Sequence, residues 1–105
     1  MIRPSQLDVE REARSFSRRA FSGNRSSVHK KSNHIVMAAE AIRIRWNVSP
    51  KHWQVKHVRW FLEHKLADRA SGTKYRYYLW IRQVLIFQNH WTDWKPQLKG
   101  PWTKP

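Results

Sequence analysis

The sequence predicts an all-α fold, a small bundle of three to five helices. Apolar residues recur every three or four positions in several separate windows, as on one face of a helix. Turn-forming residues separate these windows at 47–50 and 68–73. No window alternates apolar and polar residues over a strand's length, and no internal repeat is visible. A chain of 105 residues has room for one domain with a small core.

Residues 1–33 are predicted to form a basic N-terminal arm that is partly disordered in the free protein. Ser and Arg dominate this segment. A short helix between about Ser5 and Phe21 is compatible with four apolar residues at helical spacing: Val9, Ala13, Phe16 and Ala20. That stripe is thin, and a helix with a narrow apolar face gains little from packing.

The predicted bundle covers residues 34–91, and its first helix has the clearest apolar face. The residues on this face are Val28, Ile35, Ala38, Ala39, Ile42 and Trp46. Ser26 or Ser27 is a suitable N-cap, and Ser32 or Asn33 is an equally suitable alternative. The helix should end near Asn47, where the turn begins.

A second helix is predicted from Pro50 to about Ala67, because Ser49 is a good N-cap and proline suits the first helical position. Its core face comprises Val55, Val58, Phe61, Leu62 and Leu66. A second stripe lies almost opposite: Trp53, His57, Trp60 and His64. Two interpretations of this stripe are open. It packs against the N- or C-terminal arm, or it faces DNA or a protein partner.

A third helix is predicted over about 72–89, with Ser71 or Thr73 as its N-cap. It is apolar nearly all round, as in a helix at the centre of a bundle. Its main stripe comprises Tyr77, Tyr78, Ile81, Val84 and Leu85. Residues 92–105 are rich in Trp and Pro, and we expect an irregular tail whose tryptophans fold back on the bundle.

Charge and aromatic content point to a polyanionic partner. The chain carries 21 Lys and Arg against 7 Asp and Glu, a formal net charge of +14. A charge of this size favours nucleic acid, whose phosphates attract such proteins. All seven tryptophans lie in the last 60 residues, which argues against a merely disordered basic tail.

Several function classes find no support in the sequence. There is no cysteine, so disulfides and thiolate chemistry are excluded. No apolar run is long enough to span a membrane. His57 and His64 are seven residues apart, too far for the paired ligands of one metal on a helix, and no metal or cofactor is expected. No catalytic constellation is visible, so we expect neither an enzyme nor a small-molecule substrate.

Residues 50–91 carry a resemblance to a known family. The motifs are Pro50-Lys51-His52 through Lys56-His57-Val58, then residues 71–77 (SGTKYRY), then Ile81-Arg82. This segment resembles the N-terminal, SAM-like core-binding domain of phage and prophage integrases, which are tyrosine recombinases. The resemblance implies a bundle of four or five helices that clamps one face of a recombination site. The family commonly has Asn-Arg where this chain has Tyr75-Arg76, so only the arginine carries over.

The resemblance and the basic pattern together give the expected DNA-binding residues: Lys51, Lys56, Arg59, Thr73, Lys74, Arg76 and Arg82. No Arg…His-x-x-Arg…Tyr set follows, so we expect binding without cleavage. The chain would be either a domain of a longer integrase or a stand-alone relative. We expect a cytoplasmic, nucleoid-associated protein that binds duplex DNA, with a recombinase or a second copy as a further partner. The alternatives are a protein-interaction module of a mobile element and an RNA-binding protein.

Overall fold

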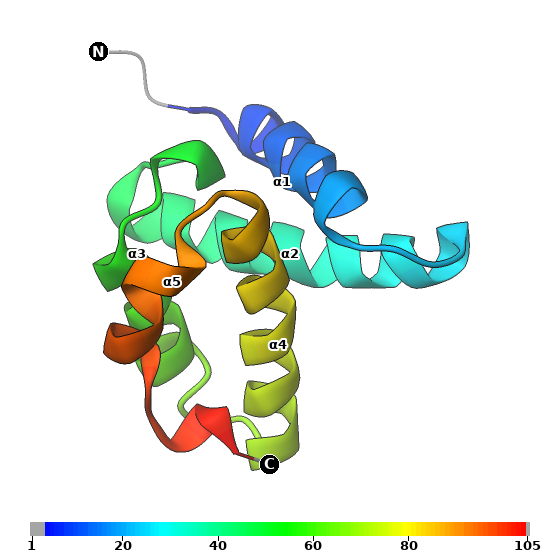
Figure 1. The fold of residues 1–105 in the computed structure, drawn as a ribbon. Helices are drawn as coiled ribbons and strands as arrows, with labels where there is room; N and C mark the ends of the chain where they lie inside the picture. Colours follow the sequence, from blue (N-terminus) through cyan, green and yellow to red (C-terminus); the bar gives the residue numbers. More distant parts are fainter. Residues whose placement is uncertain (1–3, 105) are drawn as a thin grey trace.

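Five α-helices form the framework of the computed structural model, which describes residues 4–104 (Figure 1). They are α1 (Gln6–Ala20), α2 (Arg25–Trp46), α3 (Val55–Trp60), α4 (Ser71–Phe87) and α5 (Trp91–Trp94). Short helical turns connect or follow them: η1 (Pro50–His52), η2 (Phe61–Lys65), η3 (Lys95–Leu98) and η4 (Pro101–Thr103). None of the residues from 4 to 104 forms a β-strand. The predicted all-α fold is confirmed.

The expected disordered arm is instead an ordered part of the bundle over its described residues. Ser5 and Asp8 form a reciprocal capping box at the start of α1, with the Asp8 amide 3.1 Å from the Ser5 hydroxyl. Val9 and Ala13 are fully buried where α1 packs on α2 and α4. The thin apolar stripe suffices because small side chains let α1 approach its neighbours closely. The expected boundary at residue 34 falls inside α2, and residues 1–3 of the arm lie outside the described residues.

Helix α2 begins earlier than any of the predicted caps. Asn24 is the N-cap, and its side-chain oxygen accepts a 2.8 Å hydrogen bond from the Ser27 amide. The helix ends where expected. Asn47 adopts a left-handed conformation with φ of 57°, and its N–H donates to the carbonyl of Arg43. The predicted face is buried at Ile35, Ala38, Ala39 and Ile42.

The predicted helix 50–67 is wrong as one continuous element. Residues 50–52 form a single 3₁₀ turn, the chain is extended at Trp53 and Gln54, and α3 follows. The last turn, η2, is a π-helix closed by a 3.1 Å bond from the Leu66 amide to the Phe61 carbonyl. Trp53, in the extended segment before α3, is 3% exposed, which differs from its predicted place on a face opposite the core. Leu66, just after η2, is 3% exposed, as its predicted place on the core face requires.

Helix α4 lies at the centre, in contact with α1, α2, α5, η2 and η4. Figure 1 shows α2 crossing behind α4. The N-cap of α4 is Ala70 rather than the predicted Ser71 or Thr73. Its buried residues are Tyr77, Ile81, Val84 and Leu85, as the apolar stripe predicts except for the half-buried Tyr78.

The C-terminal segment folds back on the bundle as expected, but in short helical turns rather than as an irregular tail. Its turn η3 packs on α3 and its turn η4 packs on α4. Leu98 and Trp102 are buried. The Trp102 indole N–H donates a 2.7 Å hydrogen bond to the Leu98 carbonyl, which ties η4 to η3.

Candidate nucleic-acid interface

The stripe of tryptophan and histidine on the second predicted helix packs mainly inside the protein. Trp53 and His57 are each 3% exposed. Trp46, at the end of α2, contacts His57 at a ring-centroid distance of 4.9 Å and Trp60 edge-on at 5.0 Å. Helix α2 therefore covers part of this stripe through Trp46, and η3 of the C-terminal segment also packs on α3. Only His64 of the four is well exposed.

Burial also governs the titration of His57. Desolvation lowers the pKa of its imidazole, and the charge of Lys56 lowers it further. Its Nδ1 accepts a 3.0 Å hydrogen bond from the Gln54 amide at the start of α3. This interaction requires the neutral ring with its proton on Nε2. His57 is thus a structural cap of α3 and is unavailable to a partner.

Two of the predicted DNA-binding arginines hold the C-terminal segment in place. The Arg59 guanidinium donates a 2.6 Å hydrogen bond to the Gln97 carbonyl and lies 5.4 Å from the centre of the Trp102 ring. Arg82 lies 5.8 Å from the centre of the Trp91 ring, and its Nε is buried without a hydrogen-bond partner. The C-terminal segment therefore covers part of Arg59, and Trp91 at the start of α5 covers part of Arg82.

The remaining predicted residues divide between two ends of the molecule. Lys51 and Lys56 are exposed on η1 and α3. The Gln88 side chain donates a 3.0 Å hydrogen bond to the Pro50 carbonyl, which places η1 beside the end of α4. Lys74 and Arg76 lie on the first turns of that same helix, at its opposite end. The seven predicted residues do not form one continuous face.

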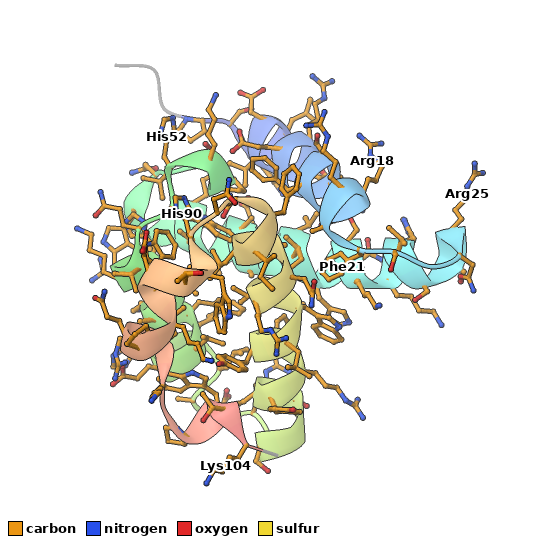
Figure 2. The ribbon with its side chains drawn as sticks, in the orientation of Figure 1. Arg18, Phe21, Arg25, His52, His90 and Lys104 are labelled. Carbon is orange, nitrogen blue, oxygen red and sulfur yellow. The ribbon has the colours of Figure 1, made fainter. Side chains whose placement is uncertain are left out.

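A cluster of cations surrounds the start of α4, and we call it the α4 patch. It comprises Lys65, Arg69, Lys74, Arg76 and Lys104, all exposed or half-exposed. Figure 2 shows Lys104 at the end of the molecule where α4 begins. Thr73, also predicted, is half-buried within the first turn. Asp68 is the nearby acid in sequence, and it forms no ion pair with the patch among residues 4–104.

Sequence reasoning missed Lys65, Arg69 and Lys104 as members of one cluster. Lys65 and Arg69 come shortly before α4 in the chain, so the sequence already indicates that they lie near its start. Lys104 comes 30 residues after Lys74 and reaches the patch only through the packing of η4 on α4. No local pattern predicts that contact.

The outer side of α4 carries a second feature suited to nucleic acid. Arg76, Leu79, Gln83 and Ile86 follow one another along the helix at spacings of three or four residues. Each of these side chains is partly or largely exposed, and Ile86 is 43% exposed. Helix α4 contains no acidic residue at all. Its N-terminal amides lack a side-chain cap, which leaves donors and the positive end of the helix dipole at the α4 patch.

A cluster of aromatic rings between α2 and α4 is structural. His34 stacks on Trp80 at 4.2 Å, and its Nδ1 lies 3.1 Å from the Tyr77 hydroxyl. That hydroxyl also lies 3.1 Å from the Met37 sulfur. Burial lowers the pKa of His34 and raises the pKa of Tyr77. Both groups are held in their neutral forms near pH 7, without a nucleophile or carboxylate beside them.

Among residues 4–104, no three His, Cys, Asp or Glu side chains are grouped so that they could hold a metal ion. None of the helices in this range is long and apolar enough to cross a membrane.

Comparisons with known proteins leave the site to be interpreted on its own geometry. No protein-family model matches the chain, and no curated protein or solved structure matches it either.

Proposed function

We propose that this chain binds duplex DNA through the α4 patch and the outer side of α4. The observation that carries the proposal is an uncapped start of α4, a helix without acidic residues, which has five cations and one acid, Asp68, on and near its first two turns. Backbone amides at a helix start and flanking Lys and Arg side chains are the usual partners of phosphate oxygens. The patch would neutralise phosphates and orient the helix on the duplex.

The side chains along α4 suit base contacts in a major groove. Arginine pairs with guanine, glutamine with adenine, and aliphatic groups with the thymine methyl. Arg76, Gln83 and Leu79 supply these three kinds of group on one side of α4. A helix fits the width of the groove, and the 17-residue α4 is long enough to follow it for several base pairs.

The resemblance to integrase core-binding domains supports a recombination site as the natural target. Cytoplasmic, nucleoid-associated location follows from the same proposal. A test compares a recombination-site duplex of a mobile element with a random duplex of equal length at the same salt concentration. Tighter binding to the recombination site supports this refinement, whereas equal affinity for both duplexes limits the proposal to general DNA binding.

The main test is a fluorescence-anisotropy titration of duplex DNA at several salt concentrations. We expect log K to fall with log salt by about 0.9 per phosphate contacted. The variant Lys74→Gln/Arg76→Gln should reduce the magnitude of this slope by about 2. The control Lys51→Gln/Lys56→Gln removes the same charge at the other end of α4, and it should change the slope less.

Two results count against the proposal. One is DNA binding that does not depend on salt, and the other is an equal loss of affinity in both double variants. Competition with duplex RNA decides whether RNA is the better ligand, because A-form RNA has a major groove too narrow for a helix.

A second candidate function is protein binding by α2. Met37 and Ile44 lie two turns apart on this helix and are 50% and 70% exposed. Exposed apolar side chains on one helix face are typical of a partner surface. Affinity capture after nuclease treatment separates the two functions, because a partner bridged by nucleic acid would be lost.

A further inference from the structure

A basic groove lies at the elbow between α1 and α2, and none of the seven predicted DNA-binding residues lines it. It has a volume of about 420 Å³. Its lining residues are Arg14, Arg18, Gly23, Arg25, Val28, His29 and Ser32. No carboxylate lines it. By contrast, the larger groove between α1 and η1, of about 890 Å³, is lined by Asp8 and Glu12 as well as by Arg11 and Lys51.

The arginines of the elbow groove are held in two different ways. Arg14 is fixed in the wall, since it donates to Glu10 at 3.2 Å and to Asn33 at 3.1 Å. Arg18 and Arg25 make no ion pair or side-chain hydrogen bond with any described residue. Figure 2 shows both projecting to the same side of the elbow. The loop between them turns at Gly23, whose φ of +122° disfavours other residues.

The start of α2 lacks a neighbouring acid of its own. Its first turn contains no acidic residue, and Arg25 directly follows the N-cap. A cation is destabilising at this positive end of the α2 dipole, whereas Arg18 lies in the last turn of α1, where a cation is favourable. A bound anion interacts favourably with the start of α2 and with both guanidinium groups.

We propose that the elbow groove binds a phosphodiester group of a nucleic-acid backbone. Arg18 and Arg25 contact the phosphate oxygens, and Val28 faces the sugar. Arg14, which is fixed in the wall of the groove, sets the distance between the phosphate oxygens and that wall. The identity of the anion rests on the proposed function. One molecule then contacts the backbone at two separate places, the α4 patch and the elbow, which lie at different ends of the fold (Figure 1).

The test removes the two unpaired charges. Arg18→Gln/Arg25→Gln is compared with wild type and with Arg19→Gln/Lys30→Gln, which removes equal charge from exposed positions of the same helices outside the groove. In duplex-DNA titrations, the elbow variant should reduce the magnitude of the salt slope by about 2, and the control should reduce it less. The elbow variant should unfold at nearly the same temperature as wild type, because it removes one favourable helix-dipole interaction, that of Arg18, and one unfavourable interaction, that of Arg25.

Each remaining outcome has a defined meaning. If the elbow variant and its control reduce the magnitude of the salt slope equally, the proposed phosphate site in the groove is overturned. The proposal for the α4 patch is then unaffected. If wild type fails to bind DNA, both proposals fail. An NMR titration with inorganic phosphate at constant ionic strength identifies a third case. A shift of the Gly23 amide in wild type, absent from the elbow variant, combined with unchanged DNA binding in that variant, assigns the groove to free phosphate and overturns the backbone contact.

Discussion

Gly100 illustrates how a single residue determines the closure of the C-terminal segment. A Cβ atom at this position would lie 2.4–2.6 Å from three carbon atoms of the Trp102 ring. Trp102 is only 3% exposed and its indole N–H is bonded to Leu98, so the ring has little room to move. The φ of Gly100 is 179°, which is open to any residue, so the backbone conformation does not require glycine. Glycine is needed here because the backbone closely approaches a buried ring.

Gly100→Ala should therefore destabilise the protein by about 1–3 kcal/mol, as overpacking of a core does. The matched control is Gly72→Ala, where the added Cβ meets nothing within 4 Å. Since Gly72 lies in the first turn of α4, that change should stabilise the protein by roughly 0.5–1 kcal/mol. Thermal unfolding of both variants measures the difference, and similar midpoints would contradict the close contact.

The arginines show where residue-level reading of the sequence reaches its limit. Arg59 and Arg76 look alike in the sequence, each within a basic helix beside aromatic residues. The structure binds Arg59 to the carbonyl of Gln97, 38 positions away, and leaves Arg76 exposed. Whether a cation is available to DNA depends on such distant contacts, which no local spacing reports.

At the scale of elements, α3 depends on the protonation state of one side chain. The neutral His57 ring accepts a hydrogen bond from the Gln54 amide and packs against Trp46. The segment before α3 was predicted as helix, because Pro50 and the apolar spacing satisfy local rules. Burial of Trp53 outweighs those rules, and the helix starts five residues later than expected.

Acidification should destabilise the fold through His57. Its pKa is lowered in the folded state, so the unfolded chain, with a pKa of about 6.5, binds more protons as the pH falls below that value. As far as His57 is concerned, the free energy of unfolding is therefore at its full value above about pH 6.5 and declines below that pH. The lowered pKa of His34 acts in the same direction.

Melting temperatures at about pH 7.5 and pH 5.5 test this prediction, since the two values lie on either side of the unfolded-state pKa. His57→Gln should reduce the difference between them, because it removes the buried imidazole and leaves only the half-buried His34 with a lowered pKa. His52→Gln is the control, since His52 is exposed, and it should keep the wild-type difference. A wild type whose stability is unchanged over this range would contradict the buried neutral ring.

At the scale of the whole molecule, the dominant feature is a charge of +14 on a body measuring 36 × 34 × 27 Å. Between about 0.01 M and 0.15 M salt, the Debye length falls from about 30 Å to about 8 Å. At the lower concentration, each charge interacts with charges across most of the molecule. Self-repulsion of this kind opposes the compact state.

The melting temperature should accordingly rise as NaCl is added over that range. A short DNA duplex should raise it further at constant ionic strength, because a ligand bound to the folded state stabilises it. The melting temperature of the α4-patch variant Lys74→Gln/Arg76→Gln should rise less than that of wild type when the duplex is added. Its rise with NaCl should be similar to that of wild type. A duplex effect of the same size in that variant and in wild type would argue against the patch.

Four features follow from the sequence alone: the all-α class, the turns near 47–50 and 68–73, the core faces of α2 and α4, and the basic character of α4, which has no acidic residue. These features depend on residue type and on spacings of three or four, which act within one turn of a helix. The inclusion of the N-terminal segment in the core appears only once the chain is folded. The same holds for the burial of Trp53, for the contact of Trp46 with His57, and for the contacts of Arg59 with Trp102 and of Arg82 with Trp91. It holds as well for the exposure of the α4 patch and of the elbow groove. Those outcomes depend on contacts between residues tens of positions apart, whose energies come from burial and shape rather than from local pattern.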